Sequence, residues 1–210
     1  MEEPSARDRI LKSAAHLFYM EGIRSTGVDA IAERAGVTKK TLYYHFTSKD
    51  DLIAAYLTQR DPPNLAAFAR WLKASDGPLP DRIAGVFAGI EAAARHPKWK
   101  GCGFLRTVAE LANMPGHPAR QVAAAHKKKV EGWLADLFRA EGLTDTEPLA
   151  RQIAVLIDGV FSAMLVHRDA SYAEAAGQAA RALVAAALVR PLHSAAAQNG
   201  ACGEPVASLC

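Results

Sequence analysis

The sequence has few cysteines, no apolar run that approaches the length of a membrane-spanning helix, and no apolar signal-like stretch at its acidic N-terminus. Its three cysteines, Cys102, Cys202 and Cys210, are an odd number at wide spacing. This spacing excludes a disulfide framework and a CxxC metal site. We therefore expect a cytoplasmic protein with no membrane partner, no cofactor and no bound metal.

Patterns typical of β-strands are also scarce, because alternating β-branched residues are few whereas alanine is abundant. Hydrophobic residues make up 50% of the 210 positions, so the chain can bury a substantial core. The net charge of +3 is too small to indicate a nucleic-acid partner by itself, so the placement of the charges must decide. The chain is predicted to be all-α.

Apolar spacing, caps and stop signals predict where the helices lie. The predicted helices cover residues 5–22, 28–35, 39–45, 48–61, 64–75, 80–95, 102–113, 117–140, 147–167 and 171–190. Asp61-Pro62-Pro63 is expected to end the fourth helix, because proline lacks the amide that a helix interior needs.

The same pattern predicts two domains and a tail. A three-helix helix-turn-helix domain is expected over residues 1–50, and a helix at about 48–61 links it to the next domain. A helical bundle for ligand binding and dimerisation is expected over residues 62–193. Residues 194–210 lack apolar periodicity and are expected to form a disordered tail.

Residues 34–49 carry four cations, two adjacent tyrosines and no carboxylate. Thr38 is placed to cap a short helix, on which Leu42 and Phe46 face inward and the basic and tyrosine side chains face outward. Such a helix fits the major groove of B-DNA. The alternative, aromatic core residues beside a solvated lysine face, is accepted for Phe46 and left open for Tyr43. It is weaker for the cations, because a solvated helix usually mixes charges of both signs.

Four runs of this region, Gly22–Val28, Ile31–Thr38, Thr41–Phe46 and Ser48–Leu52, resemble the N-terminal domain of the TetR family of bacterial transcriptional regulators. The resemblance covers about residues 7–57. It implies an all-helical homodimer that binds a palindromic double-stranded DNA operator, usually as a repressor that a small-molecule effector releases.

The resemblance also implies roles for individual residues. Thr26 and Tyr43 would hold phosphates, and His45 and Lys49 would clamp the flanking phosphates. The residues expected to face bases or backbone are Thr38, Lys39, Thr41 and Tyr44. Two positions depart from the family pattern: Gly27 replaces a common hydroxyl residue that caps the second helix, and Lys40 replaces a small residue and is expected to add non-specific DNA affinity.

The second half of the chain contains aromatic and polar residues that could line an effector pocket. The candidates are Phe87, Phe104, Val108, Glu110, His126, Trp133, Asp158 and Phe161. One hypothesis is that Glu110, His126 and Asp158 meet in this pocket, where they would anchor a polar group of the effector or, less favoured, bind a metal. The alternative is that each forms a local salt bridge or lies at a dimer seam, and an ordinary bundle core explains each apolar candidate taken singly.

Three further expectations concern assembly and function. The helices at about 147–167 and 171–190 are predicted to form a four-helix bundle with a second copy of the chain. Cys102 is expected to pack in the core, with a redox role as the alternative. No catalytic constellation is present, so an enzyme is disfavoured, and the remaining alternative is a DNA-binding activator or nucleoid-type protein without ligand control.

Overall fold

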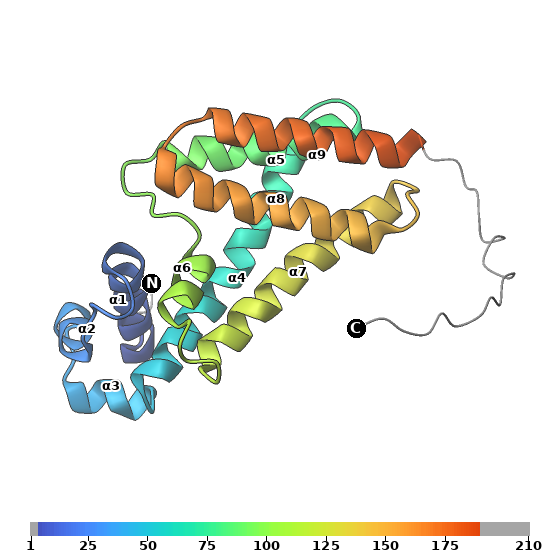
Figure 1. Ribbon diagram of the computed structural model, residues 1–210. Coiled ribbons are helices and arrows are strands. Elements are labelled where there is room, and N and C mark those ends of the chain that lie inside the picture. Colours follow the sequence, from blue (N-terminus) through green and yellow to red (C-terminus); the bar gives the residue numbers. More distant parts are fainter. Residues whose placement is uncertain (1–3, 190–210) are drawn as a thin grey trace, which may run out of the picture.

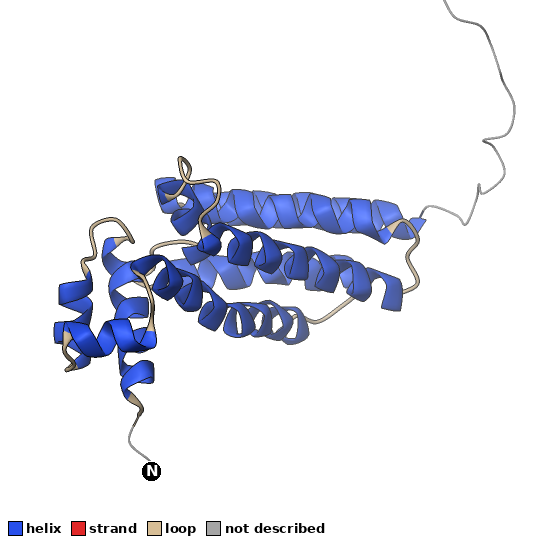
Figure 2. Cartoon of the chain, turned by 90° about the horizontal axis from the view of Figure 1, so that it is seen from below, coloured by secondary structure: helices blue, strands red, loops and turns tan. Residues whose placement is uncertain are grey.

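The computed structural model describes residues 4–189, which form nine α-helices and no strand (Figures 1 and 2). The helices are α1 Ala6–Glu21, α2 Val28–Ala35, α3 Lys39–His45, α4 Lys49–Ala74, α5 Leu79–Ala94, α6 Gly103–Glu110, α7 Pro118–Ala140, α8 Thr146–His167 and α9 Ser171–Val189. The all-α prediction is confirmed. The predicted tail, with Cys202 and Cys210, lies outside the described residues.

Helices α1, α2, α3 and the first half of α4 share one core, to which Ile10, Phe18, Ile31, Leu42 and Leu52 contribute. The turn between α2 and α3 follows from two local signals. Gly36 ends α2 in the left-handed conformation at φ 64°, which glycine adopts without steric cost. The Thr38 hydroxyl then caps α3 by accepting a hydrogen bond from the Thr41 amide at 3.1 Å. These signals place α3 across α2 as a helix-turn-helix requires.

The predicted break at Asp61-Pro62-Pro63 is wrong, because α4 continues through both prolines to Ala74. Pro62 and Pro63 remove the amides that would bond to the carbonyls of Thr58 and Gln59. Thr58 and Gln59 are exposed, so water can solvate these carbonyls. On the opposite face, buried residues before and after the prolines pack along the same side of the helix. Tertiary packing therefore overrides the local stop signal, and one helix connects the N-terminal helix-turn-helix unit to the bundle (Figure 1).

The C-terminal half is a helical bundle in which α5 packs on α9, α7 packs on α8, and α8 packs on α9. Its core includes Ile83, Phe87, Ile153 and Val184. Helices α8 and α9 are antiparallel neighbours joined by a turn at Arg168–Ala170 (Figure 1). Their antiparallel packing follows from the short connection between two long apolar helices.

Candidate nucleic-acid interface

The surface of α3 presents polar and aromatic side chains, whereas its inner face is apolar. Leu42 and Phe46 are buried, as predicted. Tyr44 is 84% exposed and Tyr43 is 43% exposed. Lys39 and Lys40 are also exposed, and no carboxylate lies on this helix. A large aromatic ring held in solvent beside lysines is costly for an isolated protein and suits contact with a nucleic acid.

Neighbouring groups already influence two of the predicted DNA-binding lysines. Lys39 forms an ion pair with Asp29 of α2 at 3.0 Å, and this hydrogen bond raises the pKa of the lysine. Lys49, at the start of α4, is half-buried, and this burial lowers its pKa, while the nearby carboxylates of Asp50 and Glu110 act in the opposite direction. DNA phosphates would compete with these carboxylates for the two lysines.

His45 and Thr41 lie beside the exposed part of α3. The His45 ring packs edge-on against Tyr44, with a distance of 5.1 Å between the ring centroids. The hydroxyls of Thr41 and Thr38 are 2.9 Å apart. The residues predicted to contact bases or phosphates, from Thr38 to Lys49, therefore lie on α3 and on the start of the next helix.

Thr26 differs from this prediction, because its side chain is only 1% exposed. Its hydroxyl donates a 2.7 Å hydrogen bond to the Gly22 carbonyl. In this conformation the Thr26 hydroxyl cannot donate to a phosphate, and it stabilises the α1–α2 loop (residues 22–27) instead. Gly27 is the N-cap of α2 and, because glycine has no side chain, makes no side-chain capping hydrogen bond.

The three polar residues expected to share a pocket do not meet. Glu110, at the end of α6, accepts hydrogen bonds from the α1–α2 loop. His126, on α7, bonds to Asp61 of α4 at 2.7 Å. Asp158, on α8, pairs with Lys127. The hypothesis of a shared site is wrong, because each of the three side chains is bonded to a different partner. Local ion pairs, the alternative, account for His126 and Asp158.

The aromatic candidates are likewise divided between two cores. Phe87 lies in the core between α5 and α9, whereas Phe104 stacks on His126 with a centroid distance of 3.7 Å. Trp133 and Phe161 both pack on Phe68, at 6.3 Å and 6.5 Å between centroids. Val108 packs against the N-terminal core, the core that α1, α2, α3 and the first half of α4 share. These residues stabilise the bundle and do not surround one cavity.

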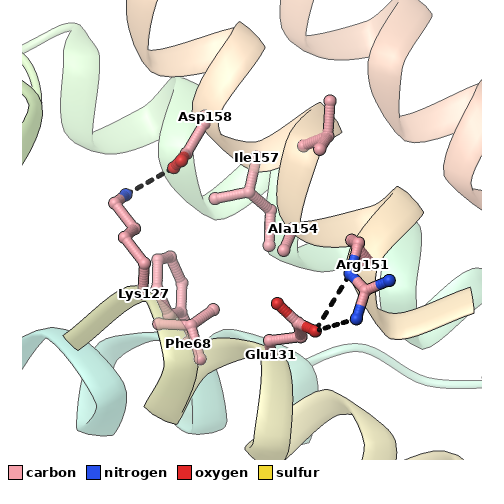
Figure 3. A pocket seen from close by; sticks show the side chains of 9 residues that line it. Phe68, Lys127, Glu131, Arg151, Ala154, Ile157 and Asp158 are labelled. Atoms are coloured by element: carbon pink, nitrogen blue, oxygen red, sulfur yellow. Dashed lines mark hydrogen bonds and ion pairs between the residues drawn. The ribbon is translucent and has the colours of Figure 1, made fainter. Parts of the chain in front are cut away.

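The structure instead contains a hollow of about 140 Å³ between α4, α7 and α8 (Figure 3). Its lining residues are Phe68, Lys127, Val130, Glu131, Arg151, Ala154, Val155, Ile157 and Asp158. Of the predicted pocket residues, only Asp158 is among them. Two ion pairs cross the hollow, Lys127 with Asp158, and Arg151 with Glu131 at 3.1 Å. The sequence contained a signal for this arrangement. Lys127 and Glu131 lie one turn apart on α7, and their opposite charges match Asp158 and Arg151, which lie two turns apart on α8.

All three side chains of the lysine run 127–129 pair with carboxylates, although Lys128 and Lys129 remain exposed. Lys127 reaches Asp158, Lys129 reaches Asp61, and Lys128 reaches Glu131 of its own helix at 3.0 Å. Cys102 is buried in the N-terminal core, as expected for a packing residue, and its Sγ lies 3.9 Å from the Lys127 Nζ. Among the described residues, no group of three or more histidine, cysteine or acidic side chains is placed to hold a metal ion.

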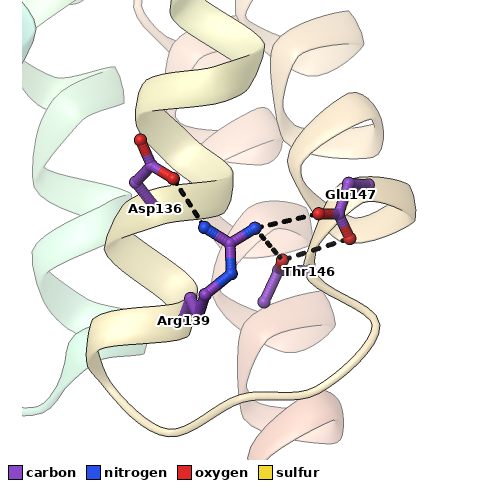
Figure 4. Close-up of polar contacts among 4 residues, drawn as sticks. All are labelled: Asp136, Arg139, Thr146 and Glu147. Atoms are coloured by element: carbon purple, nitrogen blue, oxygen red, sulfur yellow. Dashed lines mark hydrogen bonds and ion pairs between the residues drawn. The ribbon is translucent and has the colours of Figure 1, made fainter.

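The corner between α7 and α8 is held by one arginine (Figure 4). The Arg139 guanidinium bonds to Asp136 at 2.6 Å, to Glu147 at 2.9 Å and to the Thr146 hydroxyl at 3.5 Å. Asp145, the N-cap of α8 in this corner, adopts the left-handed conformation at φ 52°. These contacts connect the end of α7 to the start of α8.

A helix-turn-helix unit joined by one long helix to a separate helical bundle defines a class of DNA-binding transcriptional regulators. Residues 10–56 match the family model described as bacterial regulatory proteins, tetR family. The chain is 32% identical to a TetR transcriptional regulator (sav143) of Streptomyces avermitilis, whose crystal structure it matches with a TM-score of 0.76 over 89% of this chain and 100% of that one. The chain belongs to the TetR family.

Two curated relatives differ in the direction of their regulation. The transcriptional repressor KstR2 of Mycolicibacterium smegmatis is 30% identical over 141 residues, which are 67% of this chain and 66% of that protein. The transcriptional activator FasR of the same organism is 44% identical over 64 residues, 30% of this chain and 29% of that protein. As a member of this family, the chain is a transcriptional regulator rather than an enzyme.

Proposed function

We propose that the chain is a repressor that binds a palindromic operator as a homodimer in the cytoplasm and is released by a small-molecule effector. The observation that carries the proposal is the α3 surface, where Tyr44 stands in solvent beside lysines with no acid on the helix. Repression is favoured because the relative KstR2, which aligns with about two thirds of this chain, is named a repressor. An activator remains the second candidate because FasR resembles the same N-terminal region.

The homodimer is supported by apolar stripes on the outer faces of α8 and α9. Exposed small or apolar residues recur at helical spacing on α8, at Val155, Gly159, Ser162 and Val166. The corresponding exposed residues on α9 are Ala175, Ala179, Ala182, Ala186 and Val189. Two such helix pairs would bury these stripes in a four-helix bundle. Helix α8 is long and apolar enough to cross a membrane, but one of its faces packs in the core of the bundle within the chain, and the proposed dimer would cover the other face.

Such a dimer would present two copies of α3 to successive major grooves about 34 Å apart. The residues that we assign to DNA are Thr38, Lys39, Lys40, Thr41, Tyr43, Tyr44, His45 and Lys49. The hollow between α4, α7 and α8 is the proposed effector site, because it is bounded by the helix that continues into the DNA-reading unit. A ligand there would change the equilibrium between DNA-competent and splayed dimers, provided that it binds the two forms with different affinity.

Operator binding can be tested by footprinting DNA upstream of the gene that encodes this protein, and neighbouring intergenic DNA, at moderate salt. We expect a protected palindrome. A Tyr44→Ala variant should lose specific affinity, by about 1–3 kcal/mol if the ring or hydroxyl contacts bases. Lys40→Ala should reduce the salt dependence of binding by about one phosphate contact, whereas the exposed Lys98→Ala variant, on the loop between α5 and α6, should change neither. Unchanged binding by both α3 variants would contradict the assignment.

A transcription assay decides between the two directions of regulation. A reporter driven by the protected promoter should be silent in the presence of the protein and active in a deletion strain. The opposite pattern would favour the activator.

A further inference from the structure

The carboxylate of Glu110 connects the bundle to the DNA-reading unit. Its Oε1 accepts a hydrogen bond from the Ile23 amide at 3.3 Å, and its Oε2 accepts one from the Arg24 amide at 2.9 Å. In return, the Arg24 Nε donates to the Glu110 main-chain carbonyl at 2.8 Å. Hydrogen bonds to an ionised acceptor are stronger than neutral ones. One side chain therefore holds two consecutive amides of the α1–α2 loop.

The fit around this carboxylate is close. Gly22 adopts φ +94°, and a Cβ at this position would lie 3.1 Å from Glu110 Oε1. The Gly22 carbonyl accepts a hydrogen bond from the buried hydroxyl of Thr26. Gly27, the N-cap of α2, follows directly. The position of the Glu110 carboxylate thus determines the conformation of the loop and, through it, the placement of the N-terminus of α2, an end of the helix whose free amides suit phosphate.

The connection between α6 and α7, which follows Glu110, contacts the start of α4. His117 caps α7 with Nδ1, which accepts from the Ala119 amide at 3.1 Å, and its buried Nε2 lies 3.2 Å from Asp50 Oδ1. Asp50 adjoins Lys49, the proposed phosphate clamp. Residues 110–118, which we call the α6–α7 corner, therefore contact the loop that precedes α2 and the helix that follows α3.

Additional contacts hold α6 on α1. Arg106 of α6 donates to the Tyr19 carbonyl at 2.6 Å, and the Tyr19 hydroxyl accepts from the Lys100 amide at 2.9 Å. The Arg60 guanidinium of α4 lies over the Tyr19 ring, 4.6 Å from its centroid. A displacement of α6 by a ligand would therefore be transmitted to α1 and the loop that follows it.

We propose that Glu110 is a positioning residue for DNA binding: its carboxylate holds the α1–α2 loop in the arrangement that fits operator phosphates, while His117 of the same corner contacts the start of α4. The inference rests on the proposed function. When the bundle moves α6, the loop loses its two acceptors and the DNA-competent arrangement becomes less populated. Because such coupling is reciprocal, operator binding also disfavours the displaced position of α6.

The test uses Glu110→Ala, with Glu91→Ala as a matched control that removes a half-buried carboxylate of α5, which pairs with Arg95 and does not contact the DNA-reading unit. Glu110→Ala should weaken operator binding by about tenfold, since it removes two charge-assisted bonds. Glu110→Gln keeps one acceptor oxygen and should show an intermediate loss. Glu91→Ala should bind like the unmodified protein.

A second measurement needs no operator. Hydrogen exchange of the peptide that spans residues 22–28 should accelerate in Glu110→Ala, while the dimer and the exchange of α8 stay unchanged. If Glu110→Ala folds poorly, operator affinity and hydrogen exchange are both measured on Glu110→Gln. Wild-type operator affinity and wild-type exchange in the glutamate variants would overturn the proposal and leave the proposed function intact. If the unmodified protein binds no operator, the proposed function fails instead, and the exchange result alone decides whether Glu110 holds the loop.

Discussion

Replacing Asp61 by alanine should destabilise the protein strongly, although the residue lies beside two prolines in a helix. The Asp61 carboxylate accepts a hydrogen bond from the His126 Nδ1 at 2.7 Å and also pairs with Lys129. A carboxylate can only accept, so His126 must donate through Nδ1. The histidine side chain is 2% exposed and is stacked on Phe104. Without Asp61, a buried N–H between α4 and α7 has no acceptor.

The magnitude follows from this burial. Leaving a buried donor without a partner costs about 1–3 kcal/mol, and the lost bond was charge-assisted, so we expect a loss near the upper end, about 2–3 kcal/mol. The Lys129 side chain is exposed and adds little. For a chain of this size, each kcal/mol lowers Tm by about 2–4 °C, so the expected decrease in Tm is about 4–12 °C.

Thermal denaturation followed by circular dichroism measures this decrease, at one protein concentration because a dimer gains apparent stability with concentration. The control is Asp136→Ala, which removes a carboxylate that is 77% exposed and bonds to Arg139 on the surface. Its Tm should stay close to that of the unmodified protein. Equal Tm values for the two variants would refute the reasoning, because burial would then not distinguish the two carboxylates.

Four further predictions concern glycines and pH. Gly132→Ala should raise the free energy of unfolding by about 0.5–1 kcal/mol in urea denaturation, because the added methyl meets no atom and alanine favours a helix. Gly89→Ala should lower it by about 1–3 kcal/mol despite the same propensity gain, because its Cβ would lie 2.3 Å from the Trp71 ring; a stabilised Gly89 variant would contradict the packing. Gly27→Ser should cap α2 and raise the free energy of unfolding by about 0.3 kcal/mol. It should also tighten operator binding in an anisotropy titration, because the site is open and a hydroxyl at this N-terminus can reach a phosphate. Weaker binding would argue against this role. Burial lowers the pKa of His126 below its usual 6.5, so the unfolded chain takes up this proton at a higher pH than the folded chain. Stability should therefore decrease as the pH falls through 6.5 toward the folded pKa, and a His126→Gln variant with the same pH profile would exclude this histidine as the cause.

The helix-turn-helix could be predicted because its signals are local. Gly36, Thr38, Leu42 and Phe46 lie within a few turns of one another, and each has the role that its residue type and spacing indicate. The prediction of Thr26 as a phosphate contact did not anticipate that its hydroxyl would turn inward to the Gly22 carbonyl. That choice depends on the conformation of the loop, which Glu110 holds from α6.

Polar residues in the second half were identified correctly as unusual but were given the wrong partners. Glu110, His126 and Asp158 each bond to a residue at least 31 positions away. Helical periodicity indicates which face of a helix is apolar, but it does not indicate which helix that face meets. The pairing of Lys127 and Glu131 with Asp158 and Arg151 therefore became visible only when α7 and α8 were placed side by side.

Local sequence signals establish that this protein is all-helical and that its TetR-type motifs form a helix-turn-helix, because caps, turns and apolar periodicity act over a few residues. The tertiary structure decided the rest. It carried α4 through Pro62 and Pro63, it separated the predicted effector residues, and it brought Glu110 against the α1–α2 loop. These outcomes depend on which surfaces meet and which polar groups are buried, and both are properties of the packed molecule rather than of any short segment.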